Sequence, residues 1–247
     1  MLKTLVAIPV HNERQHVTRV LDEVRKYATD ILVVDDGSTD DTPLLLAHQP
    51  VEVIRHARNR GYGQALIDAF RYAQCQCCRY DWLITMDCDE QHEPASLPVF
   101  LDLAGRGGAD VVSGSRYLDG PAGEPGAGQP PADRREINRV MTQHINERLG
   151  LALTDAFCGF KAHRVEALRR LDLNEPGYAF PLQFWVQAAA RDLRIIETPV
   201  PLIYNDPNRS FGGSLDNAPL RLRHYLEVFE RELARFPDKF PTPAAAR

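Results

Sequence analysis

Two aspartates one residue apart, Asp87 and Asp89, follow an apolar segment and precede Gln91 and His92. Alternate residues of an extended chain point to the same side, so both carboxylates can face one ligand. Neighbouring negative charges are costly unless a cation offsets them. Oxygen ligands suit Mg²⁺ or Mn²⁺, which keep further positions for water and phosphate oxygens. The pattern therefore predicts a divalent-cation site for a phosphate-bearing ligand, with a solvated acidic turn as the alternative.

A second acidic cluster, DDGS at 35–38, also follows a short apolar segment. A carboxylate there can accept hydrogen bonds from a nucleobase or a ribose. Alternatively, the segment caps the next helix through Ser38 or Asp40. The glycine-containing segment Asn59–Gly63 leaves a comparable choice. Its backbone N–H groups can bind a diphosphate, or the segment is a turn between a strand and a helix.

An alternation of apolar segments and helical patterns positions these clusters. Strands are predicted at 2–10, 31–34, 51–55 and 82–86. Helices are predicted at 17–27, 39–48 and 61–73. Such repeats build an α/β fold, a Rossmann-like, mainly parallel sheet with helices on both faces, and ligands bind beyond the carboxyl ends of its strands. Both acidic clusters fall at such ends, so two strands deliver carboxylates to one edge of the sheet.

The second half of the chain is more mixed. Strands are predicted at 110–113, 195–200 and 202–204, and helices at 134–149, 180–191 and 220–236. Residues 120–131 contain four Gly and four Pro, which predicts a loop. The apolar stripe of 220–236 favours a helix that docks on the core over a membrane-surface or dimer helix. Because no linker divides the chain, one domain is expected over residues 1–247.

The composition excludes several classes of protein. The chain has 247 residues, 44% of them hydrophobic, which is enough for a core without disulfide bonds. Its net charge of −5 argues against a nucleic-acid partner. No apolar segment approaches the ~18 residues of a membrane-spanning helix, and the first residues lack a signal-peptide pattern. We therefore expect a cytoplasmic protein with reduced cysteines, at most peripheral at a membrane.

The order of the motifs resembles the family 2 glycosyltransferases of the GT-A fold, especially their dolichyl-phosphate mannosyltransferase branch. Six segments between about residues 3 and 205 carry the resemblance: IPVHNE, VVDDGSTDDT, RNRGYGQAL, MDCDEQHEP, GSRY and DAFCGFKAHR. It implies a GT-A domain with a donor-binding half at about 1–118 and an acceptor-side half at about 119–247. It also implies inverting transfer of a hexose from a nucleotide-diphosphate sugar, GDP-mannose or a UDP-hexose, with Mg²⁺ or Mn²⁺.

The resemblance also implies roles for single residues. The donor-binding residues would be Pro9, His11, Glu13, Val34, Asp36 and Cys88, with His11 standing where a tyrosine is usual. The metal-binding residues would be Asp87, Asp89 and Gln91. The residues facing an acceptor phosphate would be Arg116, Arg134, Asn138 and Arg209. Two of these depart from the family: a serine is usual at position 138, and the basic spacing around residue 209 is missing.

The acceptor decides whether a base is needed. A hydroxyl acceptor generally requires one, whereas a phosphate is already anionic and needs only cations such as Arg116, Arg134 and Arg135. Many family 2 enzymes supply the base from a Glu-Asp pair, and here only Asp155 stands in that region. The sequence thus favours a phosphate-bearing acceptor, for which the resemblance implies polyprenyl phosphate, with Asp89, Arg116 and Asp155 as candidate catalytic residues. Transfer to a soluble hydroxyl or phosphate metabolite, and nucleotide-sugar binding without turnover, stay open as alternatives.

Overall fold

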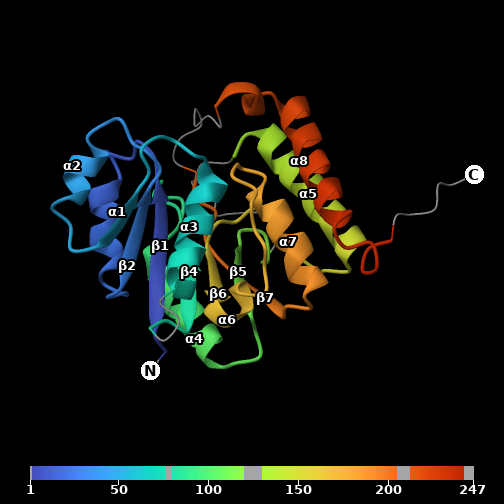
Figure 1. Cartoon of the computed structure of the whole chain (residues 1–247), viewed down its shortest axis with the longest axis horizontal. Helices are drawn as coiled ribbons and strands as arrows, with labels where there is room; N and C mark the ends of the chain where they lie inside the picture. Colours follow the sequence, from blue (N-terminus) through green and yellow to red (C-terminus); the bar gives the residue numbers. More distant parts are fainter. Residues whose placement is uncertain (1, 76–78, 120–129, 205–211, 242–247) are drawn as a thin grey trace, which may run out of the picture.

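The computed structural model describes residues 2–75, 79–119, 130–204 and 212–241. They form one seven-stranded sheet and the helices packed around it (Figure 1). The strands are β1 (Thr4–Val10), β2 (Ile31–Asp35), β3 (Glu52–Arg55), β4 (Trp82–Thr85), β5 (Val111–Ser115), β6 (Lys161–Arg164) and β7 (Ile195–Pro199). Their order is β3-β2-β1-β4-β6-β5-β7. All neighbouring pairs are parallel except those of β6, which runs antiparallel to β4 and β5. The predicted α/β class with a mainly parallel sheet is confirmed.

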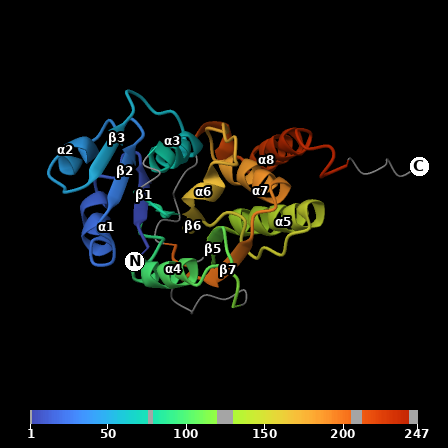
Figure 2. The ribbon, with the colours of Figure 1, turned by 60° about the horizontal axis from the view of Figure 1, so that its bottom comes forward.

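Helices cover both faces of the sheet (Figure 2). They are α1 (Val17–Val24), α2 (Thr42–Leu46), α3 (Tyr62–Cys75), α4 (Leu97–Gly105), α5 (Ala132–Leu149), α6 (Val165–Leu168), α7 (Phe180–Ala190) and α8 (Ala218–Leu233), with short 3₁₀ turns at Pro94–Ser96 and Gly213–Asp216. Alternate residues of β1 point to opposite faces. Val6 and Ile8 pack with α1 and α4, whereas Leu5 and Ala7 pack in the core of α3, α5, α7 and α8. Two apolar cores therefore hold the strands from both sides.

The apolar stripe near the end of the chain belongs to α8, which packs against α5 and α7. Its buried residues include Tyr225, Val228, Phe229 and Leu233. The prediction of a docking helix is therefore confirmed. Within the described ranges, no helix is both long and apolar enough to cross a bilayer.

Some predicted elements differ from the observed ones. Residues 202–204 were expected as a strand, but they form none, while β6 and α4 were not predicted. The strand β6 has the sequence KAHR, and three polar side chains in four residues hide its burial pattern. Residues 120–129 of the predicted Gly/Pro loop lie outside the described residues.

His163 on β6 is a histidine inside the apolar core. Its ring lies 4.9 Å from the ring of Phe70 and 5.2 Å from that of Phe184, measured between centroids. Burial, together with the positive charge of Lys161, lowers the pKa of His163 to about 3. The folded protein therefore holds this ring neutral at pH values where an exposed histidine already binds a proton.

This difference predicts how stability depends on pH. As pH falls from about 6.5 toward 3, His163 binds a proton in the unfolded chain but stays neutral in the folded chain. The free energy of unfolding therefore decreases. Between pH 7 and pH 5 this one group removes about 2 kcal/mol. Urea unfolding of the wild type and of His163→Leu at both pH values measures it. The leucine variant should lose about 2 kcal/mol less than the wild type, and an equal loss in both would contradict the assignment.

Candidate functional site

A pocket of about 890 Å³ opens at the carboxyl ends of β1, β2, β4 and β5. The predicted site residues that line it are Pro9, His11, Glu13, Asp36, Asp87, Cys88, Asp89, Gln91, Arg116, Arg134 and Asn138. Val34 is buried in β2 and Asp155 is buried beneath the pocket, so neither lines it. Arg209 lies outside the described residues. The fold thus brings most of the motif residues, from segments far apart in the sequence, to one cavity.

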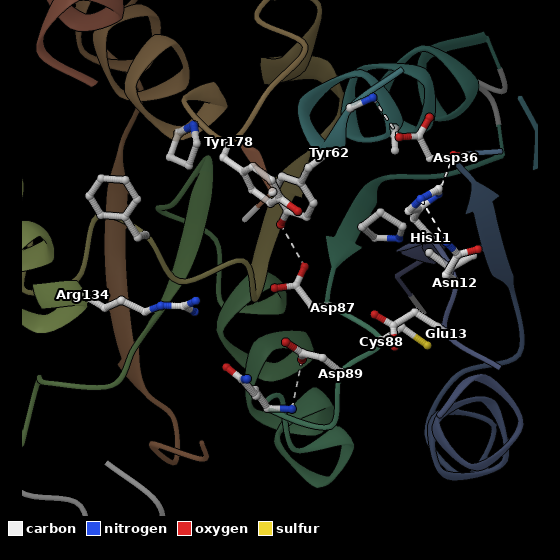
Figure 3. A pocket seen from close by; sticks show the side chains of 18 of the residues that line it. His11, Asn12, Glu13, Asp36, Tyr62, Asp87, Cys88, Asp89, Arg134 and Tyr178 are labelled. Carbon is white, nitrogen blue, oxygen red and sulfur yellow. Dashed lines mark hydrogen bonds between the residues drawn. The ribbon is translucent and has the colours of Figure 1, made fainter. Parts of the chain in front are cut away.

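The loops after β1 and β2 are joined at the right side of the pocket in Figure 3. His11 Nδ1 lies 2.9 Å from the Asp36 carbonyl oxygen, so Nδ1 carries the hydrogen and donates it. Asn12 has a φ of +59°, a conformation that asparagine tolerates better than most residues. Its Oδ1 accepts from the Thr39 N–H at 2.8 Å, and its own N–H donates to Ser38 Oγ at 2.9 Å. These bonds fix the ring of His11 at the pocket wall.

The Asp36 carboxylate organises the turn into α3. Its Oδ1 accepts from the Arg60 N–H at 2.7 Å and its Oδ2 from the Gly61 N–H at 2.8 Å. Oδ1 also lies 2.6 Å from Nδ1 of the buried His56. Gly61 has a φ of +104°, and a Cβ there would lie 2.3 Å from the Pro176 carbonyl oxygen. The segment 59–63 therefore matches the interpretation as a strand-to-helix turn, because Asp36 already takes two of its N–H groups.

Asp87 and Asp89 lie at the centre of the pocket, just beyond β4 (Figure 3). Asp87 Oδ1 accepts from the Tyr62 hydroxyl at 2.8 Å, and Asp89 Oδ1 accepts from the Gln91 N–H at 3.1 Å. Burial and the charge of Asp87 raise the pKa of Tyr62 well above its usual value, so this hydroxyl stays protonated. A Cβ on Gly159 would lie 2.7 Å from Asp87 Oδ2. Glycine at this position leaves the space that the carboxylate occupies.

The buried His92 supports the same loop through contacts with Asp87. The Asp87 N–H donates to His92 Nδ1 at 2.8 Å, and His92 Nε2 lies 3.8 Å from Asp87 Oδ2. Burial by itself lowers the pKa of His92, but the charge of Asp87 and the hydrogen bond with Cys158 raise it to about 8. The sequence indicated only that His92 lies beside the acidic pair. Its hydrogen bond to the Asp87 backbone shows how it holds the loop.

The donor set fits a metal ion that arrives with its ligand. No cluster of three or more His, Cys, Asp or Glu side chains in the described part of the chain is arranged to hold an ion. Asp87 and Asp89 supply two carboxylates, and Gln91 lines the same pocket. Mg²⁺ is commonly bound by one or two carboxylates together with substrate phosphates and waters. The residues present are therefore suited to a divalent ion completed by a diphosphate.

Arg116, which lines the pocket, forms an ion pair with the fully buried Asp155. Arg116 Nε donates to Asp155 Oδ2 at 2.6 Å, and Nη2 donates to Oδ1 at 2.9 Å. Burial alone raises the pKa of Asp155, but Arg116 and then Asn138 lower it far below its usual range. A fully buried carboxylate held in its charged form by an arginine is a poor base. The geometry therefore assigns Asp155 to the support of Arg116 and does not favour the candidate base.

Asn138 also contributes to this support. Its Nδ2 donates to Asp155 Oδ1 at 2.9 Å, and its Oδ1 accepts from Thr142 Oγ1 at 2.9 Å. Arg134, one turn earlier on α5, lies with its guanidinium carbon 5.8 Å from the ring centroid of Tyr204. Of these two predicted acceptor residues, Arg134 is therefore the better placed to meet a ligand.

Several pocket residues were not predicted from the sequence. They are aromatic or basic side chains from the second half of the chain and from α3: Tyr62, Tyr117, Phe157, Tyr178, Tyr204, Arg221 and Tyr225. Tyr62 lies inside the RGYGQAL motif, and Tyr178 follows Pro-Gly in a polar segment. An aromatic residue next to a glycine is the sequence feature that could have indicated Tyr62 and Tyr178 as site residues.

Comparison with solved structures agrees with this fold. The glucosyl-3-phosphoglycerate synthase of Mycobacterium tuberculosis, solved in complex with UDP, superposes with a TM-score of 0.65 over 99% of this chain and 82% of its own, at 19% identity. The same synthase has been solved with UDP and Mg²⁺, at a TM-score of 0.67 and 19% identity over 99% of this chain and 81% of its own. The fold is that of the GT-A glycosyltransferases.

Sequence relatives define the family. The family model for glycosyl transferase family 2 matches residues 5–172. The undecaprenyl-phosphate mannosyltransferase of Micrococcus luteus is 32% identical over 236 residues, 91% of this chain and 94% of that protein. The polyprenol monophosphomannose synthase of Mycolicibacterium smegmatis is 31% identical over 209 residues, 80% of this chain and 76% of that protein. The chain belongs to glycosyl transferase family 2 and is a glycosyltransferase.

Proposed function

We propose that this enzyme transfers a hexose, with inversion, from a nucleotide-diphosphate sugar to polyprenyl phosphate, with the help of Mg²⁺ or Mn²⁺. The observation that carries the proposal is the division of charge in the pocket. Asp87 and Asp89 stand at its centre, and Arg134 lies on the side away from His11 (Figure 3), while Arg116 also lines the pocket. The names of the two bacterial relatives, an undecaprenyl-phosphate mannosyltransferase and a polyprenol monophosphomannose synthase, support the same acceptor.

The donor would lie across the carboxyl ends of the strands. We place the nucleoside at His11 and Asp36 and the diphosphate at Asp87 and Asp89, with Gln91 as a further ligand of the cation. When bound, the divalent ion offsets the charge that develops on the departing diphosphate. The aspartates keep this ion in place, and the backbone around Pro9 and Glu13 closes the nucleoside end. GDP-mannose and a UDP-hexose are both compatible with these residues.

The acceptor would be held by cations and needs no base. A phosphate oxygen of the acceptor attacks the anomeric carbon as the bond from this carbon to the diphosphate oxygen breaks, and the electron pair leaves with the nucleoside diphosphate. Arg116 gives one hydrogen each from Nε and Nη2 to Asp155, so the hydrogens of Nη1 and the second hydrogen of Nη2 can be donated to a phosphate. Charge-assisted hydrogen bonds of this kind are short and directional, so they fix the orientation of a phosphate. Asn138 takes part indirectly, through Asp155.

The proposal is tested with a donor that carries a radiolabelled sugar. The enzyme, Mn²⁺ and either GDP-mannose or UDP-glucose are incubated with polyprenyl phosphate in detergent, and the label is followed into the organic phase. Label in the lipid product that depends on Mn²⁺ supports the proposal. Label found only in water-soluble products of a cell extract would assign a soluble acceptor instead. Donor binding without any transfer would indicate a nucleotide-sugar-binding protein.

Arg134→Ala is expected to weaken acceptor use and leave the donor untouched. Loss of one charge-assisted hydrogen bond costs about 1.5–3 kcal/mol, which corresponds to about a ten- to hundredfold higher KM for polyprenyl phosphate. Arg139→Ala is the matched control, because Arg139 is exposed on the same helix and paired with Glu136. Steady-state kinetics with each substrate varied in turn separate the two effects. A loss of donor affinity in Arg134→Ala would instead place this arginine in the nucleotide site.

A further inference from the structure

The proposed function leaves one part of the pocket without a ligand group, the surface between the carboxylates and Arg134. Two tyrosines form this surface. Tyr62 and Tyr178 stack with their ring centroids 5.7 Å apart and their planes inclined by 13°. Figure 3 shows the rings overlapping beside Asp87, between His11 on one side and Arg134 on the other. Tyr178 is 37% exposed, and both tyrosines line the pocket.

We propose that Tyr178, backed by Tyr62, is the face on which the hexose ring of the donor lies during transfer. This inference rests on the proposed function and names the group that determines how the sugar is held. In a nucleotide-diphosphate sugar, the hexose is attached directly to the second phosphate. A diphosphate at Asp87 and Asp89 whose nucleoside points toward His11 therefore places its hexose on the side of Tyr178 and Arg134.

The chemistry of the two partners is complementary. The face of an aromatic ring carries partial negative charge, and its edge carries partial positive charge. One side of a hexopyranose presents C–H groups, which are apolar and slightly positive, and this side packs well on an aromatic face. The hydroxyl groups of the sugar then point away from the ring, toward the polar residues of the pocket. A sugar without such a C–H face would pack poorly here, so the platform also contributes to sugar selectivity.

Tyr62 connects this platform to the proposed metal site. Its hydroxyl donates to Asp87 Oδ1 at 2.8 Å, so the ring behind Tyr178 has a fixed orientation relative to the carboxylate. Within the donor, covalent bonds set the distance between the sugar and the diphosphate. A platform tied to the diphosphate-binding residue therefore holds the anomeric carbon in a defined place, which favours an in-line approach of the acceptor.

The segment that carries Tyr178 is held in place by neighbouring helices. Gln183 Oε1 on α7 accepts the N–H groups of Asn174 and Glu175 at 2.7 and 2.8 Å. The Gln64 N–H on α3 donates to the Pro176 carbonyl oxygen at 3.0 Å. A Cβ on Gly63 would lie 2.3 Å from the Glu175 carbonyl oxygen, so this close approach requires glycine. The platform is thus formed before a ligand binds, and little conformational entropy is lost on binding.

The test compares affinities and does not need turnover. Isothermal titration with Mn²⁺ measures the dissociation constants of UDP and UDP-glucose, and of GDP and GDP-mannose, for the wild type and for Tyr178→Leu and Tyr178→Phe. The sugar nucleotide bound by the wild type should bind about five- to tenfold more weakly to Tyr178→Leu, in the upper part of the range expected for a lost aromatic contact. Its parent diphosphate should bind equally well to both. Tyr178→Phe, which keeps the ring face, should stay within about twofold of the wild type.

Tyr27→Leu is the matched control, since Tyr27 is also 37% exposed and lines a separate cavity. An equal loss for the diphosphate and the sugar nucleotide in Tyr178→Leu would overturn the proposal, because the ring would then serve the nucleotide. Unchanged affinity for both, with a higher KM for the acceptor, would overturn it in favour of an acceptor contact. In a further outcome, Tyr178→Leu weakens binding of the sugar nucleotide alone while the wild type transfers no label to polyprenyl phosphate. That result would contradict the proposed acceptor and support the role of Tyr178.

Discussion

Asp89→Asn is expected to lower the rate of hexose transfer about a thousandfold, equivalent to about 4 kcal/mol of transition-state stabilisation. The substitution removes one of the two negative charges that face the cation. Its effect on folding should be small, because the new amide oxygen can still accept the Gln91 N–H that Asp89 Oδ1 accepts at 3.1 Å. The measurement is kcat/KM with saturating polyprenyl phosphate over a range of Mn²⁺ concentrations.

Asp102→Asn provides the control for this experiment. Asp102 is an exposed residue of α4 that pairs with Arg106, and it does not line the pocket. The same chemical change there should leave kcat/KM within about twofold, as expected for an exposed ion pair. Activity of Asp89→Asn within tenfold of the wild type, at every Mn²⁺ concentration, would contradict the role of this carboxylate.

Asp155→Asn is expected to reduce the free energy of unfolding by about 3–5 kcal/mol, because it leaves the charge of the largely buried Arg116 without its partner. The pair is bidentate, and Asp155 is fully buried. The exposed control Asp102→Asn should change the free energy of unfolding by less than about 1 kcal/mol. Urea unfolding of both variants at pH 7 gives the comparison, and equal small losses would contradict the structural role.

The double variant Asp155→Leu/Arg116→Met separates stability from activity. Replacing both members of a buried ion pair by apolar residues is often neutral or stabilising. The double variant should therefore unfold at higher urea concentrations than Asp155→Asn, yet it should remain inactive because Arg116 is lost. Recovery of activity together with stability would show that Arg116 does not contact the acceptor.

The sequence predicted the first half of the fold well because its strands are continuous apolar segments. β1, β2 and β4 are buried on both faces, so their apolar residues reveal them without alternation. β6 could not be found in this way, since Lys161 and His163 are polar residues buried by contacts with Trp185 and Phe184 from a distant helix. Its antiparallel place between β4 and β5 depends on such long-range packing, which local patterns do not contain.

The candidate site was predictable in its positions but not in its internal contacts. The spacing of Asp87 and Asp89 and the family resemblance of Arg116 predicted a shared site, and all three residues line one pocket. It gave no sign that Asp155 pairs with Arg116 across 39 residues of sequence. Tyr178 was missed because a single aromatic residue in a turn follows no periodic pattern. Contacts of this kind arise only when separate elements meet, so they require the folded chain.

The central claim is that Asp87 and Asp89 hold a divalent ion on a nucleoside diphosphate, and one titration tests it directly. Isothermal titration of GDP and of UDP into the wild type and Asp89→Asn, with Mn²⁺ and with a chelator, gives four dissociation constants for each nucleotide. We predict that Mn²⁺ strengthens binding of one nucleotide to the wild type at least tenfold, about 1.4 kcal/mol, and does not strengthen it in Asp89→Asn. Binding that is equally strong in the chelator, or equally strengthened in the variant, would contradict the claim.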